Sequence, residues 1–196
     1  ALCAALEAGY SILPIYILDD ANAGRDKIGA ASRVWLHHSL KSLNTYIGDA
    51  LLCYKGDART LLPDILKEHD AAGIYWNRCY EPWRIARDKE IKESLIEEGY
   101  DVRSFNGSLL WEPWEIHKQD GTPYRVFTPY YRKGCLGAPT PRLPLKVPQV
   151  LEITNQYEDT YSIERLDLLP SLSWGADMMS HWNVGEDAAL GRLNEF

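Results

Sequence analysis

The feature that most constrains this chain is an alternation of short apolar runs with helical patterns over residues 1–107. Four runs are apolar and β-branched enough to form strands, and three of them lack the polar alternation of a half-exposed strand. They are ILPIYIL (12–18), ALLCYKG (50–56), GIYWNR (73–78) and the more polar DVRSFNG (101–107). We therefore expect short strands that are mostly buried on both faces.

The segments between these runs have the spacing of helices. In residues 29–48 four apolar side chains recur at helical intervals, namely Leu36, Leu40, Leu43 and Ile47. In the next segment Asp57 is the expected N-cap, and Pro63 predicts that the regular helix starts late. Strands and helices in this order predict an α/β fold, a Rossmann-like doubly wound parallel sheet.

The two ends of the chain predict structure outside that alternation. Residues 1–8 are helix-like with no strand before them, so we expect a first strand upstream of residue 1. Residues 122–131 are expected to be extended, and four prolines within ten residues exclude helix over 139–148. Residues 184–196 predict a helix that starts near Gly185.

Composition restricts the classes of partner. The formal charge is −7, with 19 basic and 19 acidic residues before residue 151 and 2 against 9 after it. A nucleic-acid-binding surface needs a basic stripe, which this chain lacks. No apolar run reaches the ~18 residues of a membrane span. The four cysteines, Cys3, Cys53, Cys79 and Cys135, form no CxxC pair, which favours a reduced, cytoplasmic protein without a thiolate metal site.

Ligands of open α/β sheets bind beyond the carboxyl ends of the strands. Here those ends carry polar residues such as Asp19, Asp20 and Asp57, each of which is also a normal cap or turn residue. No glycine-rich phosphate loop or GxSxG motif occurs, and no histidine and carboxylate cluster has metal-ligand spacing. The residues alone predict a nucleotide-class domain with no catalytic residues and no metal.

Five segments together resemble the DNA photolyase and cryptochrome family. IYILDD (15–20) is similar to the second strand of its N-terminal antenna domain, and GAASRVWLHHSLKSLN (29–44) to the following helix. YWNRCYEPWRIARDKEI (75–91) resembles the fourth strand and its helix, and GTPYRVFTPYYRKGC (121–135) a Thr-Pro-Tyr, Val-Phe-Thr-Pro segment. WNVGEDAALGRLNEF (182–196) resembles the helix that opens the flavin-binding domain.

The resemblance implies a domain organisation. Residues 1–135 would be the antenna α/β domain, with about five strands of which the first precedes residue 1. Residues 136–180 would be an interdomain linker, and residues 181–196 the start of an all-α FAD-binding domain. The basic DNA-binding face would belong to that helical domain, so this segment needs no basic stripe.

The resemblance also implies a function, that of a deoxyribodipyrimidine photo-lyase. Reduced FAD would use blue or near-UV light to split cyclobutane pyrimidine dimers in damaged DNA. The antenna domain would hold a second chromophore, a methenyltetrahydrofolate or a deazaflavin, that passes its energy to the flavin. The segment alone would not catalyse, and the whole protein is expected to be monomeric.

Five residues of this sequence are candidates for the antenna pocket. Asp19 and Arg33 match pocket-facing residues of deazaflavin-binding members, and Glu81 matches a glutamate after the fourth strand. Trp83 and Arg84 stand where some folate-binding members have Asn-Glu, so that folate binding mode is not expected here. Trp83 either stacks on a planar ring or packs the start of its helix.

Two other functions remain open at this point. A cryptochrome, a photoreceptor that signals without repairing DNA, would share the same N-terminal domain. A free-standing nucleotide-binding module is a weaker alternative, because it would need a glycine-rich loop after its fourth strand. Residues 77–84 contain no glycine.

Overall fold

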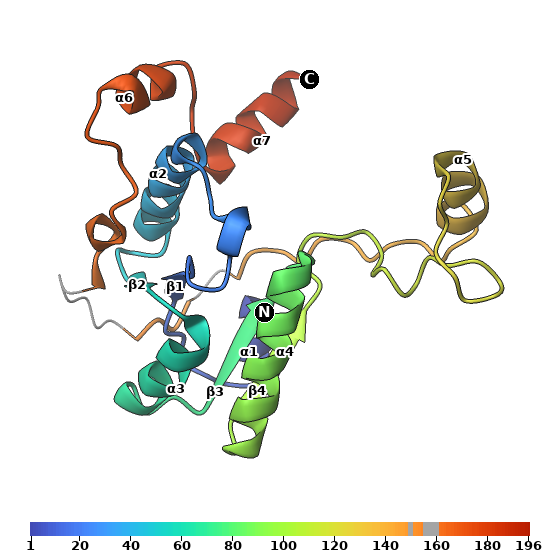
Figure 1. The fold of residues 1–196 in the computed structure, drawn as a ribbon, viewed down its shortest axis with the longest axis horizontal. Helices are drawn as coiled ribbons and strands as arrows, with labels where there is room; N and C mark the ends of the chain where they lie inside the picture. The colour runs from blue at the N-terminus through green and yellow to red at the C-terminus, as the bar shows by residue number, and fades with distance from the viewer. Residues whose placement is uncertain (149–150, 155–160) are drawn as a thin grey trace.

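The computed structural model describes residues 1–148, 151–154 and 161–196. Its first 105 residues alternate between helices and strands, as the sequence predicts (Figure 1). The elements are α1 Leu2–Glu7, β1 Ile15–Leu18, α2 Ala30–Tyr46, β2 Leu52–Lys55, α3 Ala58–Glu68, β3 Gly73–Asn77, α4 Pro82–Glu97 and β4 Asp101–Phe105. Each expected strand is present, although three of the four are at least two residues shorter than the apolar run that predicts them.

The strands form two parallel pairs. β1 pairs with β2, with Ile15 opposite Leu52, and β3 pairs with β4, with Gly73 opposite Asp101. Among the described residues no ladder joins β1 to β3. Parallel pairing through helical connections is confirmed, and the observed units are two two-stranded sheets.

Helices cover both faces of β1, because its side chains alternate between two cores. Tyr16 and Leu18 pack with α2 and β2 in one cluster, which also contains Ile163 and Leu166. The side chains of odd number on β1 pack on the other face, against α3, α4, β3 and β4. Leu18 is buried and the other three residues of β1 are partly buried, and this packing on both faces explains why the run that forms β1 is almost wholly apolar.

Three of the four apolar residues predicted for the buried face of α2 pack on the core: Leu40 is buried, and Leu36 and Ile47 are partly buried against the same cluster. Val34, His37 and Leu40 are buried, whereas Leu43 is 47% exposed. A further segment, α6 (Trp174–Met179), also packs on this helix, and a Cβ on Gly175 would lie 3.2 Å from a methyl group of Val34. Periodicity identifies a helix, but it does not specify which later segment will cover it.

The expectation of a late start for α3 is wrong. The helix begins at Ala58, and the Asp57 side chain caps it by accepting a hydrogen bond from the Arg59 amide at 2.9 Å. Pro63 lies within the helix, and because proline has no backbone N–H the helix loses one hydrogen bond there. Ala58, Leu62 and Leu66 are buried on this helix, and their packing offsets the missing bond.

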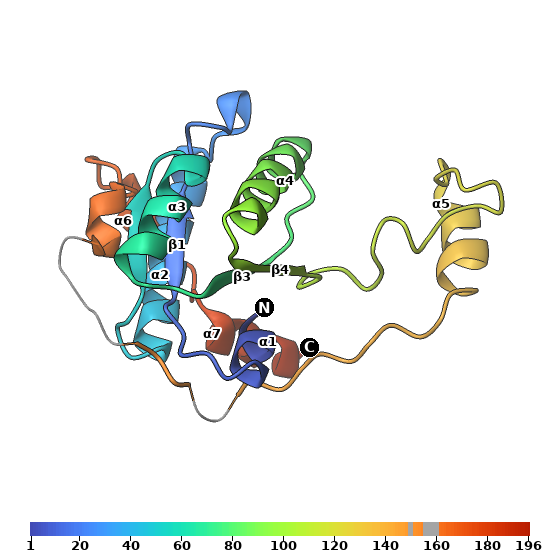
Figure 2. The same cartoon turned by 90° about the horizontal axis from the view of Figure 1, so that it is seen from below.

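Residues 108–148 leave the body as an arm that carries a short helical unit (Figures 1 and 2). The expected extended structure over 122–131 is wrong from Phe127 onward, because α5 (Phe127–Pro129) continues into a π-helical turn at Tyr130–Cys135. Ile116 and Cys135 form the small buried centre of this unit. Proline at 129 is tolerated because it falls in the first helical turn.

The C-terminal part returns to the body. Ile163–Leu166 forms a 3-10 turn whose apolar side chains enter the core between α2 and β2. The final helix, α7, runs from Glu186 to Glu195 with Gly185 at its N-cap, close to its expected position. Residues 149–150 and 155–160 of the expected linker lie outside the described residues.

Candidate functional site

A polar site lies where β1 and β2 end and α4 begins. Its central group is the Asp19 carboxylate, which directly follows β1 and whose side chain is only 2% exposed. The same carboxylate accepts hydrogen bonds from Asn22, from the Ala58 amide at the start of α3 and from Arg87 of α4. Segments far apart in the sequence are therefore joined at one buried charge.

The partners of Asp19 keep it ionised. Burial alone would raise the pKa of Asp19, but hydrogen bonds from the Asn22 side chain and amide, the Ala58 amide and Arg87 bring the pKa below its usual range. Asn22 also donates to Asp57 at 2.8 Å, so one amide bridges the carboxylates that follow β1 and β2. The hydrogen bond from the Arg59 side chain is the main reason that the pKa of Asp57 is lowered.

Arg33, a predicted pocket residue, forms its ion pair with Asp20, the carboxylate that follows Asp19. Its Nη2 lies 2.5 Å from Asp20 Oδ2, and its Nε donates to the Ile28 carbonyl at 2.9 Å. Arg33 is in the first turn of α2, so these contacts fasten that turn to the loop after β1. In this structure Arg33 does not itself line the cavity.

The start of α4 supplies an aromatic ring, Trp83, that lies close to two guanidinium groups. The Cζ atoms of Arg84 and Arg87 each lie 5.1 Å from the Trp83 ring centroid, within cation–π range. Arg84 donates to the Cys79 sulfur at 3.1 Å, and its Nε is 3.8 Å from Glu81 Oε2, too far for a hydrogen bond. The buried Arg84 Nε therefore has no acceptor among the described residues.

These groups surround a cavity of about 110 Å³. Three of the five predicted residues line it: Asp19, Trp83 and Arg84. The other two predicted residues stand behind lining residues, Arg33 behind Asp20 and Glu81 behind Arg84. The remaining lining residues are Tyr16, Ile17, Leu18, Asp20, Ala23, Asp26, Ile28 and Arg87. Burial raises the pKa of the Tyr16 phenol, which stays neutral at the cavity wall.

Sequence reasoning missed Asn22 and Arg87, which complete the network. Arg87 follows Trp83 by one helical turn, so the face of α4 that carries Trp83 was a signal for it. Asn22 had no comparable signal, because its role depends on the distance between the ends of β1 and β2.

The lining suits an organic ligand with an acceptor group. An aromatic ring, an unsatisfied guanidinium donor and apolar walls from β1 can hold a conjugated ring that carries a carbonyl or anionic oxygen. Over the described ranges no three His, Cys, Asp or Glu side chains are grouped as metal ligands. The free volume is smaller than a fused tricyclic ring, so a ligand of that size would need Trp83 or Arg84 to move.

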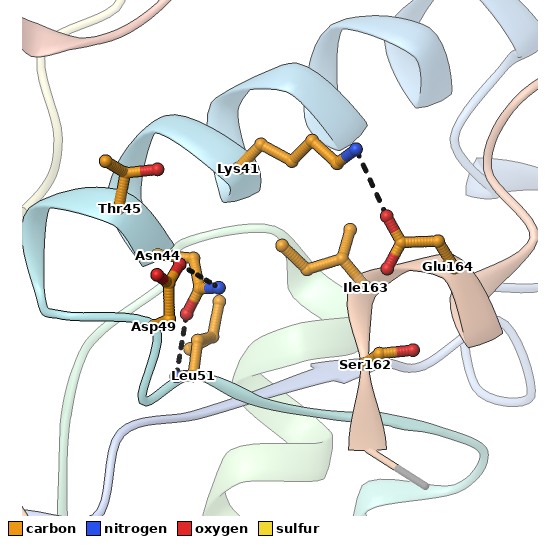
Figure 3. A pocket seen from close by; sticks show the side chains of 8 residues that line it. All are labelled: Lys41, Asn44, Thr45, Asp49, Leu51, Ser162, Ile163 and Glu164. Atoms are coloured by element: carbon orange, nitrogen blue, oxygen red, sulfur yellow. Dashed lines mark hydrogen bonds and ion pairs between the residues drawn. The ribbon is translucent and has the colours of Figure 1, made fainter. Parts of the chain in front are cut away.

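A second cavity, of about 250 Å³, lies at the other end of α2 (Figure 3). It is lined by Lys41, Asn44, Thr45, Asp49, Leu51, Ser162, Ile163 and Glu164. Lys41 forms an ion pair with Glu164 at 3.1 Å, and Asn44 accepts from the Leu51 amide at 2.8 Å, as the dashed lines show. Its polar groups are mostly engaged with one another, and it contains none of the predicted residues.

Comparisons with known proteins agree on the family. The family model for DNA photolyase matches residues 1–149. A deoxyribodipyrimidine photo-lyase of Agrobacterium fabrum is 37% identical over 200 residues, covering 100% of this chain and 41% of the relative. Cryptochrome-2 of Arabidopsis thaliana is 34% identical over 208 residues, covering 100% of this chain and 33% of the relative.

A solved structure gives the same result for the fold. A bacterial class III photolyase from Agrobacterium tumefaciens superposes with a TM-score of 0.88 at 35% identity, covering 100% of this chain and 40% of that one. The chain thus spans well under half the length of these relatives. Family model, sequence identity and fold agree, and the chain belongs to the DNA photolyase family.

Proposed function

We propose that this chain is the antenna-chromophore part of a deoxyribodipyrimidine photo-lyase, with the chromophore bound in the cavity beyond β1. The observation that carries the proposal is the buried Arg84 Nε without an acceptor, beside the Trp83 ring in that cavity. A conjugated ligand with an acceptor oxygen would satisfy this donor and contact the indole. The chromophore would be a methenyltetrahydrofolate or a deazaflavin.

The residues of the chain would bind and orient this group. Asp19, held ionised, fixes Arg87 and with it the start of α4. Arg87 in turn contacts the Trp83 ring, and Arg33 fastens α2 to the loop after β1, which contributes Ile28 to the cavity lining. The bound chromophore would collect light and pass the energy to reduced FAD. No acid, base or nucleophile is required for that role.

The division of the chain follows from the same proposal. Residues 1–135 would be the antenna domain, residues 136–180 the linker and residues 181–196 the start of the FAD-binding helical domain. A further parallel strand between β1 and β3 would join the two observed pairs into one five-stranded sheet. The absence of a ladder between these two strands among the described residues is the support for that strand.

Damaged DNA would be the partner of the complete enzyme, bound through the helical domain, and the enzyme would be a monomer. Along the described parts of the chain, no helix has the length and apolar character needed to cross a membrane. We place the protein in the cytoplasm, and its four free cysteines support a reducing compartment.

The test is a photoreactivation assay on the full-length protein with DNA that contains cyclobutane pyrimidine dimers. Blue light should remove the dimers, and the 196-residue chain alone should neither remove them nor retain flavin. Absence of light-dependent repair by the full-length protein would reject photolyase activity. A cryptochrome is the second candidate, favoured by the 34% identity to Cryptochrome-2, and it would bind flavin without repairing the DNA.

A further inference from the structure

The start of α7 is attached to α2 at two points. The rings of Trp35 and Trp182 form an edge-to-face pair with centroids 5.7 Å apart and an interplanar angle of 82°. Three residues later the backbone of Gly185 passes against Ser42 of α2. Trp35 and Ser42 are seven residues apart and lie on the same face of α2, about 10 Å along its axis.

The second attachment point requires glycine for two independent reasons. Gly185 has a φ of 111°, a backbone conformation that residues with a side chain rarely adopt. A Cβ at this position would also lie 2.3 Å from the Ser42 Oγ and 3.1 Å from the Ser42 Cβ. The chain can therefore approach α2 this closely, and turn into α7 here, only with glycine.

Beyond this joint α7 makes little contact with the other described residues. Its apolar side chains Leu190, Leu193 and Phe196 are 50%, 68% and 109% exposed. Within the described residues, the direction of α7 is therefore set by the Trp35–Trp182 and Ser42–Gly185 contacts. Figure 1 shows α7 leaving the body beside α2.

The same helix also borders the candidate pocket. Two residues before Trp35, Arg33 binds Asp20 of the cavity wall at 2.5 Å. Val34 between them is fully buried, so this part of α2 cannot shift independently of the core. One rigid helix thus contacts the pocket at its first turn and holds α7 along its next turns.

We propose that α2 fixes the position of α7 relative to the pocket, with Trp35, Trp182 and Gly185 as positioning residues. This inference rests on the proposed function, in which α7 begins the flavin domain and the pocket holds the chromophore. Energy transfer between two chromophores falls steeply with their separation and depends on their relative orientation. A flexible connection would allow a wide range of separations and orientations. Two contacts on one face of a helix restrict the separation and the orientation to a narrow range.

The joint can be tested in the 196-residue chain itself. Two indoles in edge-to-face contact give an exciton couplet in far-UV circular dichroism, which should be lost in Trp182→Leu and in Gly185→Ala. Amide exchange over residues 182–188 should become faster in both variants. Trp114→Leu is the matched control, because Trp114 is 62% exposed against 60% for Trp182 and lies on the arm. A couplet that persists in Trp182→Leu would refute the joint.

The functional consequence is tested in the full-length protein with both chromophores bound. Trp182→Leu should leave the antenna chromophore and flavin content unchanged but lengthen the fluorescence lifetime of the antenna chromophore, while Trp114→Leu should not. Full occupancy with an unchanged lifetime would overturn the positioning role and leave the proposed function intact. If the full-length protein holds no antenna chromophore, the proposed function fails, and the couplet still decides whether the joint exists.

Discussion

Arg87 of α4 and Asp19 at the end of β1 form an ion pair, with 3.2 Å between the guanidinium Nη1 and the carboxylate Oδ2. The two side chains are 16% and 2% exposed, so the pair is shielded from water. It joins the β1–β2 half of the core to the α4 helix, although no ladder links β1 to β3 in the described residues. The same pair aligns Arg87 against the Trp83 ring at the cavity.

The first prediction concerns this ion pair. Arg87→Ala should lower the free energy of unfolding by about 2 kcal/mol, because a buried carboxylate loses its charged partner but keeps its hydrogen bonds from Asn22. Urea denaturation measures the change. Lys89→Ala is the control, since its pair with Glu93 is exposed and should change stability by less than about 0.5 kcal/mol. Equal effects of the two substitutions would contradict the prediction.

The second prediction is a loss of stability in acid. The pKa of Asp19 is lower in the folded protein than in the unfolded chain, where it is about 3.9. Its ionised form therefore stabilises the fold above that pH, and this contribution is lost as the pH falls through the folded-state pKa.

Other carboxylates, such as Asp57, also have lowered pKa values, so the informative quantity is a difference between variants. Asp19→Asn should be less stable than the wild type at pH 7, and the difference in stability should narrow as the pH falls below about 4. Denaturation midpoints measured across that range provide the test. A gap that is constant with pH would rule out the contribution of Asp19.

The third prediction concerns the close approach of β3 and β4. A Cβ on Gly73 would lie 2.2 Å from the Asp101 carbonyl oxygen, which belongs to the backbone and cannot rotate away. Gly73→Ala should therefore lower the free energy of unfolding by about 3 kcal/mol or more. Gly191→Ala in α7 has open space around it and should be neutral or stabilising, by up to about 1 kcal/mol. Thermal denaturation of both variants distinguishes them.

The fourth prediction concerns the cavity. In the full-length protein, Trp83→Leu should weaken antenna-chromophore binding by about fivefold, the effect of losing one aromatic contact of about 1 kcal/mol. Arg84→Met should weaken it as well, because methionine removes the buried Nε donor and leaves a side chain with no N–H group. Chromophore content per protein, read from the absorption spectrum, measures both. Trp114→Leu should leave the content unchanged, and full retention in Trp83→Leu would remove Trp83 from the site.

The elements that the sequence predicts well are those whose structure is set by residues within one short segment. The run ILPIYIL contains the strand whose side chains pack on both faces, Asp57 caps α3, and Gly185 is the N-cap of α7. Leu43 remains exposed, although Leu36, Leu40 and Ile47 of the same predicted face pack on the cluster that contains the 163–166 turn.

The candidate site divides in the same way. Asp19, Trp83 and Arg84, which the family resemblance proposed, line the cavity, and Asp19 is also visible in the sequence as a carboxylate that follows a strand. Asn22 could not be predicted, because its amide bridges Asp19 and Asp57 only when the ends of β1 and β2 lie within hydrogen-bond distance of it. Arg33 was predicted beside the site, but its choice of Asp20 over Asp19 depends on the path of the intervening turn.

The sequence by itself determined the α/β class, the parallel strands and the family. The apolar strand runs, the helix caps and the segments that resemble the family are all properties of residues that are neighbours in the sequence. Only the tertiary structure decided which charges meet. Asp19 lies 68 residues from Arg87, and Trp35 lies far from Trp182, yet each pair is in contact. Such contacts depend on how distant segments pack together. The periodicity of one segment shows which of its faces is apolar, but it does not identify the segment that will pack on that face.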